Sequence, residues 1–280
     1  MSLLRRGRGR LAHEVRRLRR RLDRATAPRL SAACLQRVLS SLSPADVVMV
    51  HSSLSSCGDV VGGVDTVVDA LVDWAGPRTL ALPTHTYCYA DDGGVGPLFD
   101  PAVTPSVVGA VTNAWWRRPG VVRSLHATHS LAARGPAAED LVAGHVDCDT
   151  PCGAGTPYAR VVDAGGSVLM FGATLNAYTL FHTAEDEAAV PYLYLPAQSR
   201  LRVRLPSGAE RETAMWRQDM TRRRRFADVD RWLEARALLV RRRLGRGVLL
   251  FVPDARAAHR ALVDQLRRDP WFLVANEARP

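Results

Sequence analysis

Short apolar runs that end in small polar residues are the feature that most constrains how this chain folds. Three of them read DVVMVHSSL, TLALPTHT and SVLMFGATL and begin at residues 46, 79 and 167. Runs of this length fit strands that are buried on both faces. Segments with helical apolar spacing, such as GGVDTVVDALVDWAG, lie between them. The alternation predicts an α/β fold with a mainly parallel central sheet flanked by helices.

Other segments predict the remaining elements. A helix follows Pro28 with Ser31 as its N-cap, TPSVVGAVTNAWWRRPG and TPYARVVDAGG are helical, and SLHATHSLAARG leads into a further strand. From about residue 199, SRLRVRLPSGAERETAMW alternates like a hairpin, and a helix, a strand and a closing helix ended by Asp269-Pro270 follow. With 280 residues, 47% of them apolar, we predict one domain over residues 29–280 with a smaller α+β C-terminal part.

The positive charge of the chain is concentrated at its N-terminus. Residues 1–30 contain 11 Arg and 2 acidic residues, a net of +9, and the remainder contains 27 Arg and 26 acidic residues, a net of +1. Residues 1–28 predict a basic helical tail that packs on the body or a partner, or that binds RNA or acidic lipid. No aromatic residue lies among these arginines, which argues against base stacking and against nucleic-acid binding.

The cysteines bear on location and metal binding. The five cysteines are odd in number and lack CxxC spacing, so we expect free thiols in a reducing cytoplasm. Cys148 and Cys152 lie near His145, but the paired clusters of a structural zinc site are missing and we expect no metal. The sequence has no apolar run of the about 20 residues that a membrane span needs, and we expect neither a span nor a signal peptide.

Polar residues gather where the predicted strands end. In parallel α/β sheets, ligands bind at the carboxyl ends of the strands. Several such ends rich in His, Ser and Thr indicate a constructed site: His51 to Ser53, Thr84 to Thr86, Ser124 to His129, and Asn176 to His182.

Three motifs have both a binding and a structural interpretation. In HSSLSSCGDVVGG, Gly62 and Gly63 precede a helix, where backbone amides favour a phosphate, but a tight turn fits equally well. Ser106 stands at the start of a predicted helix, which favours an N-cap. Arg123 is suited to binding a phosphate with two hydrogen bonds, whereas a lone Arg is usually solvated surface.

The segment TLFHTAEDE places His182 and Glu185 three residues apart, which puts both on one face of a helix. A His suits proton transfer near neutral pH, and a carboxylate fixes its tautomer. The spacing also arises by chance, so by itself it does not establish a catalytic pair. No GxSxG nucleophile elbow is present.

Four blocks in order give a closer match: VMVHSSLSSCGDVVGGVDTVVDAL, TLALPTHTY, FDPAVTPSVVGAVTNAWWRRPGVVRSLHATHSLAARG and PCGAGTPYARVVDAGGSVLMFGATLNAYTLFHTAEDEA. Together they resemble the aminoglycoside 3-N-acetyltransferase family over roughly residues 30–275. The resemblance implies an α/β fold, acetyl-CoA as donor co-substrate, and transfer to a primary amine, typically of an aminocyclitol antibiotic.

The resemblance also implies roles for individual residues. His182 would be the base, Glu185 its orienter or a ligand of the substrate amine, and Thr84 would lie near the thioester. The donor site would contain His51, Ser52, Ser53, Leu54, Gly62, Gly63, Ser106, Arg123, Ser124 and His126. Because a polycationic acceptor needs carboxylates, we expect the acceptor site to contain Tyr87, Asp91, Asp92 and Asp186.

We therefore predict a cytoplasmic, CoA-dependent N-acetyltransferase that acts on an aminoglycoside-type antibiotic by direct, general-base-assisted attack. A biosynthetic N-acyltransferase acting on another amino-bearing metabolite is the alternative within enzymes. A nucleic-acid-binding or scaffold protein acting through the Arg-rich tail is the alternative from another class. The sequence leaves the oligomeric state open, a homodimer included.

Overall fold

The computed structural model describes residues 29–275, which form two β-sheets and their flanking helices. The helices are α2 Ala32–Leu39, α3 Leu54–Cys57, α4 Gly63–Ala75, α5 Ala110–Trp115, α6 Ala138–Val142, α7 Pro157–Asp163, α8 Leu180–Glu187, α9 Asp230–Glu234 and α10 Ala255–Arg268. The strands are β1 Val47–Ser52, β2 Thr79–Pro83, β3 Val95–Phe99, β4 Val122–Arg123, β5 Leu131–Arg134, β6 Ser167–Phe171, β7 Tyr194–Arg204, β8 Glu210–Gln218, β9 Val240–Leu244 and β10 Gly247–Val252. The predicted basic tail, residues 1–28, lies outside the described residues.

The larger sheet has seven strands in the order β4-β5-β2-β1-β6-β10-β9. β1 pairs in parallel with β2 and with β6, whereas the four pairings on either side of this trio are antiparallel. The α/β class is thus confirmed, but the prediction of a mainly parallel sheet is wrong for the flanks. On one flank the cause is local, because only Gly245 and Arg246 connect β9 to β10 and so short a link makes a hairpin.

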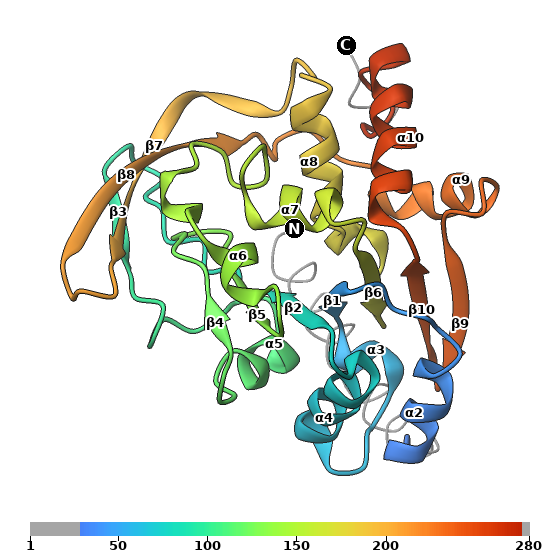
Figure 1. Ribbon diagram of the computed structural model, residues 1–280. Helices are drawn as coiled ribbons and strands as arrows, with labels where there is room; N and C mark the ends of the chain where they lie inside the picture. Colours follow the sequence, from blue (N-terminus) through green and yellow to red (C-terminus); the bar gives the residue numbers. More distant parts are fainter. Residues whose placement is uncertain (1–28, 276–280) are drawn as a thin grey trace, which may run out of the picture.

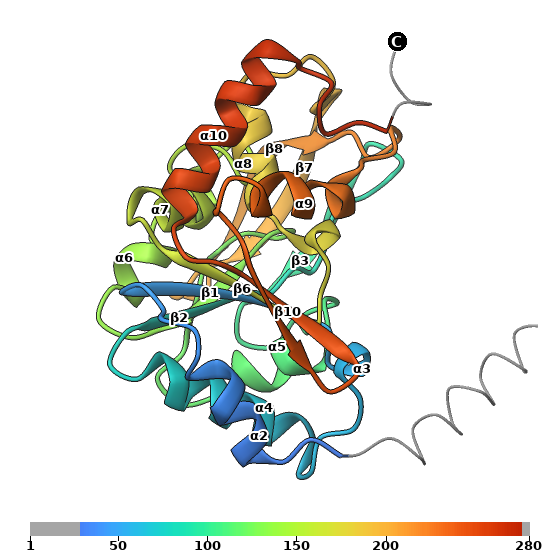
Figure 2. The ribbon, with the colours of Figure 1, turned by 90° about the vertical axis from the view of Figure 1, so that its right-hand side faces the viewer.

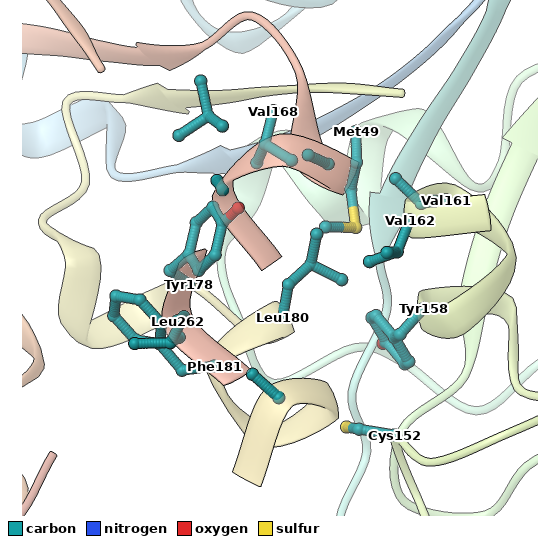
Figure 3. Close-up of a cluster of buried hydrophobic side chains, with 14 of the residues drawn as sticks. Met49, Cys152, Tyr158, Val161, Val162, Val168, Tyr178, Leu180, Phe181 and Leu262 are labelled. Atoms are coloured by element: carbon teal, nitrogen blue, oxygen red, sulfur yellow. The ribbon is translucent and has the colours of Figure 1, made fainter. Parts of the chain in front are cut away.

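Helices cover both faces of the larger sheet (Figures 1 and 2). Helices α2, α4 and α5 lie on one face and α7, α8 and α10 on the other. Side chains of β1 alternate between the two sides, as a pleated strand requires: Val48 and Val50 belong to one core, and Val47 and Met49 to the other. Figure 3 shows part of the second core, where Met49 lies near side chains from α7 and α8.

A smaller sheet of order β3-β7-β8 stands beside the larger one (Figure 1). The predicted hairpin of β7 and β8 is confirmed, and Leu201, Val203 and Met215 pack with Phe99 of β3 in a small core. The chain after residue 199 is divided between the two sheets, since β9 and β10 join the larger one. The boundaries of a single domain over residues 29–280 stay a prediction.

Local sequence explains where several helices begin and end. Ser31 caps α2 by accepting a hydrogen bond from the backbone N–H of Cys34, as predicted. Helix α4 follows Gly62, which has φ +79°, and ends before Gly76. Helix α5 begins only at Ala110, so the interpretation of Ser106 as a helix N-cap is wrong. Within residues 29–275, no helix combines the length and apolar character needed to cross a membrane.

Candidate active site

His182 and Glu185 form a hydrogen-bonded pair on α8. The distance between His182 Nδ1 and Glu185 Oε2 is 2.6 Å, and the two side chains are 11% and 0% exposed. A carboxylate accepts hydrogen bonds, so the His182 proton lies on Nδ1 and Nε2 has the free lone pair. The predicted i, i+3 pair therefore has the tautomer that a base at Nε2 needs.

The pair borders a cavity of about 660 Å³. Loops after β1 and β2, the start of α8 and the end of β8 with its following loop supply the walls. Its polar and charged lining includes His51, Ser52, His85, Tyr87, Asp91, His129, Asn176, Thr179, His182, Arg217, Gln218 and Asp219. Several of the predicted strand ends thus meet at one cavity.

The other histidines of this cavity are held neutral. Burial lowers the pKa of His51 and of His85 to about 3, and burial lowers the pKa of His129 well below its usual value. His85 is fixed between two phenols, with Nε2 2.8 Å from Tyr158 Oη and Nδ1 3.1 Å from Tyr87 Oη. Among the histidines lining this cavity, His182 is the one paired with a carboxylate.

A second cavity, of about 650 Å³, adjoins the first. Ser52 and Val108 line both cavities, so the end of β1 lies at their junction. Four of the residues assigned to the donor site line the second cavity: Ser52, Ser53, Leu54 and Gly63. His51 lines the first cavity instead. Gly62 is the N-cap of α4, next to the wall.

Besides Gly62 and Glu185, five residues assigned by resemblance lie outside the walls of both cavities: Thr84, Ser106, Arg123, Ser124 and His126. The Arg123 guanidinium donates to Thr84 Oγ1 and to Ser130 Oγ, both at 3.1 Å, and to the Thr104 carbonyl oxygen at 2.7 Å. These donors are hydrogen-bonded within the protein, and the phosphate-binding role of Arg123 stays a prediction.

The remaining three residues of that set also pack internally. Ser124 Oγ lies 2.9 Å from His145 Nδ1, and the His126 ring stacks on His145 with centroids 4.3 Å apart. Ser106 Oγ donates to the His85 carbonyl oxygen at 3.2 Å. The donor-site roles that the resemblance implies for these three residues stay predictions.

The predicted acceptor residues are only partly brought together. Tyr87 and Asp91 line the first cavity, and Arg217 lies 3.0 Å from the Asp91 carboxylate. Asp92 instead accepts a hydrogen bond from the Gly94 backbone N–H, and Asp186 accepts one from the Tyr194 hydroxyl. Neither Asp92 nor Asp186 is a lining residue.

Sequence analysis missed Arg217, which pairs with Asp91 in the wall of the first cavity, and two charged residues that follow it in the chain. Asp219 lines the first cavity, and hydrogen bonds from Thr221 lower the pKa of its carboxyl group, so it is negatively charged at neutral pH. Arg224 Nε lies 3.1 Å from Glu185 Oε1, on the side away from His182. Both follow the predicted hairpin, in a segment whose four consecutive arginines carried no recognisable motif.

The five cysteines are free thiols. Cys148 and Cys152 are both unpaired with another cysteine, as are Cys34, Cys57 and Cys88. Residues 29–275 contain no group of three or more His, Cys, Asp or Glu side chains placed to hold a metal ion.

Comparison with known proteins identifies relatives. The sequence profile of the family described as Aminoglycoside 3-N-acetyltransferase matches residues 49–266. Aminoglycoside N(3)-acetyltransferase VIII of Streptomyces fradiae is 36% identical over 191 residues, which cover 61% of this chain and 65% of the relative. The match therefore spans less than two thirds of that relative's length.

Two solved structures are similar over most of the chain. A mutant of aminoglycoside acetyltransferase AAC(3)-IVa in complex with apramycin is 29% identical, has a TM-score of 0.72, and the alignment covers 86% of this chain and 94% of that chain. AAC-IIIb in a binary complex with CoASH is 27% identical, has a TM-score of 0.75, and the alignment covers 86% of this chain and 97% of that chain.

Proposed function

Because the chain belongs to the aminoglycoside 3-N-acetyltransferase family, we propose that it transfers an acetyl group from acetyl-CoA to a primary amine of an aminoglycoside-type antibiotic. The amine is the 3-amino group, the position in the name of the family. The observation that carries the proposal is the His182–Glu185 pair, hydrogen-bonded at 2.6 Å beside a cavity that adjoins a second one. A two-substrate transfer needs such a junction, because donor and acceptor must meet at one base.

His182 acts as the general base. Glu185 holds the Nδ1 proton, and Nε2 accepts a proton from the amine. The amine nitrogen forms a bond to the acetyl carbonyl carbon, the bond from that carbon to sulfur breaks, and CoA leaves as the thiolate. No covalent intermediate with the enzyme is needed, which agrees with the missing nucleophile motif.

The second cavity suits the donor. Gly63 lines this cavity and has open space around the position of a Cβ atom, so a ligand can approach the backbone closely there. Helix α4, of 13 residues, has no side-chain cap at its N-terminus, which leaves N–H groups for an anion such as a CoA phosphate. Ser52 lines both cavities, so the proposed donor site adjoins the cavity that His182 lines.

The first cavity suits a cationic acceptor. Asp219 places a carboxylate in the wall, where it attracts ammonium groups, whereas the second lining carboxylate, Asp91, is paired with Arg217. Neutral donors and acceptors such as Asn176, Thr179 and Gln218 suit the hydroxyls of an amino sugar. Thr84 is not included in this proposal, since its hydroxyl is bonded within the protein.

The test is thiol release from acetyl-CoA, followed with a thiol-reactive dye, against a panel of aminoglycosides and simpler amino sugars. We expect amine-dependent release and a product acetylated at the 3-amino group, identified by NMR. Release with simple amino sugars but with no aminoglycoside would overturn the proposed acceptor. Absence of both release and CoA binding would overturn the proposal as a whole.

Three further properties remain predictions within this proposal: a homodimer, a cytoplasmic location, and a tail of residues 1–28 that is dispensable for turnover. Size-exclusion chromatography with light scattering tests the first and cell fractionation the second. Deletion of residues 1–27 tests the third. The comparisons do not favour a biosynthetic acyltransferase or a scaffold protein, the alternatives considered from sequence.

A further inference from the structure

A buried arginine lies directly behind the His182–Glu185 pair. The Arg224 and Glu185 side chains are 4% and 0% exposed, and Nε of Arg224 lies 3.1 Å from Oε1 of Glu185. The other carboxylate oxygen, Oε2, accepts from His182 Nδ1. The two oxygens of one carboxylate therefore bridge an arginine and a histidine, and three side chains form a continuous chain that ends at the cavity.

The remaining contacts of Arg224 hold it in one orientation. Its two terminal nitrogens donate to the carbonyl oxygens of Arg222 at 2.9 Å and Asp219 at 3.1 Å. Its guanidinium carbon lies 4.6 Å from the centroid of the Tyr192 ring. With both terminal nitrogens and Nε engaged, the side chain has little freedom to leave Glu185.

We propose that Arg224 is a positioning residue of the acetyl transfer: it keeps the Glu185 carboxylate charged and aimed at His182, so that Nε2 of His182 accepts the amine proton. This inference rests on the proposed function, in which His182 is the base. It adds a third member to the pair and assigns a task to the segment after β8.

The charge balance around Glu185 explains why Arg224 is needed. A buried carboxylate without a counter-charge is strongly unfavourable. Burial raises the pKa of Tyr192 and of Cys152, and both therefore stay neutral at neutral pH.

The groups facing His182 are neutral as well, since burial lowers the pKa of His85 to about 3 and that of His129 well below its usual value. Asp186, on the same helix, is bonded to Tyr194 and adds negative charge. Arg224 is thus the positive charge in contact with the Glu185 carboxylate among the described residues.

The same residue connects the acceptor wall to the pair. Asp219 lines the cavity, and its backbone carbonyl accepts from Arg224. On the far side, Arg224 forms an isolated β-bridge with Val274, and the Arg225 N–H donates to the Leu273 carbonyl at 2.9 Å. The C-terminal segment therefore fixes the arginine from behind.

The test compares Arg224→Met and Arg224→Lys with the wild-type full-length enzyme. Loss of the positive charge makes the His182–Glu185 pair retain its proton more tightly, so the acidic limb of the kcat/KM–pH profile should move up by about one pH unit in Arg224→Met. Lysine keeps the charge but not the fixed geometry, so in Arg224→Lys the limb should stay in place while kcat falls about tenfold. Arg222→Gln is the control, because it also removes one positive charge, but from a side chain that stacks on Trp271. It should change neither the acidic limb of the kcat/KM–pH profile nor kcat.

A readout that does not depend on turnover separates this inference from the proposed function. The ring signals of His182, assigned by difference with His182→Ala, are titrated by NMR in wild type and in Arg224→Lys and Arg224→Met. An upward shift of the His182 midpoint in Arg224→Met supports the inference even if no amine is acetylated. If Arg224→Met changes neither the His182 titration midpoint nor the acidic limb of the kcat/KM–pH profile, the role of Arg224 is overturned while the proposed acetyl transfer stands. If Arg224→Met does not fold, a limb that shifts in the folded Arg224→Lys would overturn it.

Discussion

Replacing Glu185 with glutamine tests how the carboxylate acts on His182. Glutamine has nearly the same shape but a single acceptor oxygen, whereas Glu185 uses one oxygen for Arg224 and the other for His182. The charged guanidinium takes the amide oxygen, because hydrogen bonds to ionised donors are the stronger ones. The amide NH₂ then faces His182 Nδ1, which must become an acceptor.

The consequence for catalysis follows from the tautomer. With Nδ1 accepting, the His182 proton moves to Nε2 and the free lone pair no longer faces the cavity. We expect kcat of Glu185→Gln to fall by about 10²–10⁴-fold, the range typical of general-base catalysis. This corresponds to about 3 to 5 kcal/mol of activation free energy. Arg224 keeps a hydrogen bond but loses its buried counter-charge, which should also lower the free energy of unfolding by about 3–5 kcal/mol.

The assay is steady-state thiol release, with thermal melting run in parallel to select a temperature at which the variant is folded. Glu187→Gln is the matched control, because Glu187 lies on the same helix but is 53% exposed and pairs with His259 at 2.7 Å. The control should retain kcat within about twofold. A folded Glu185→Gln protein with wild-type kcat would refute the reasoning about the tautomer.

Three more predictions concern the two cavities and their histidines. Asp219→Asn should raise KM for a polycationic acceptor about tenfold, since a hydrogen bond to a charged group contributes about 1.5 kcal/mol; an unchanged KM at low salt would contradict this. Gly63→Val should fill the open space in the second cavity and raise KM for acetyl-CoA more than KM for the amine. Gly208→Val, at a glycine with similar positive φ and similar open space, should change neither KM. Lowering the pH from 7.5 to 5.5 should destabilise the fold, because burial lowers the folded-state pKa of His51 and of His85 to about 3 and their unfolded-state pKa is about 6.5. The unfolded chain then binds more protons, which lowers the free energy of unfolding by about 1 kcal/mol for each histidine; an equal Tm at both pH values would be inconsistent with neutral buried rings.

The central strands and the main helices could be predicted because their sequence patterns are local. Continuous apolar runs identify β1, β2 and β6, and the Asp269-Pro270 stop marks the end of α10. Strand β9 could not be recognised, because its three consecutive arginines are all exposed at the sheet edge and break the apolar pattern of a strand. The antiparallel directions of the flanking strands also could not be predicted, because they depend on which strands, distant in the sequence, pair with each other in the sheet.

The site shows the same division between local and distant information. His182 and Glu185 could be paired because they are one helical turn apart. Arg224 could not, because 39 residues separate it from Glu185 and only the fold brings them together. The burial of Arg123 and His126 and their hydrogen bonds within the protein could not be predicted either, because these contacts depend on the fold and not on residue type.

The most direct test of the account is His182→Ala with acetyl-CoA and the best amine acceptor, with CoA binding measured by calorimetry alongside. His259→Ala is the control, because His259 also pairs with a glutamate but lies outside the lining of both cavities. The account predicts that His182→Ala binds CoA as wild type does and loses about 10²–10⁴-fold in kcat, whereas His259→Ala retains turnover. Turnover of His182→Ala within a few-fold of wild type would contradict the role of His182 as the base.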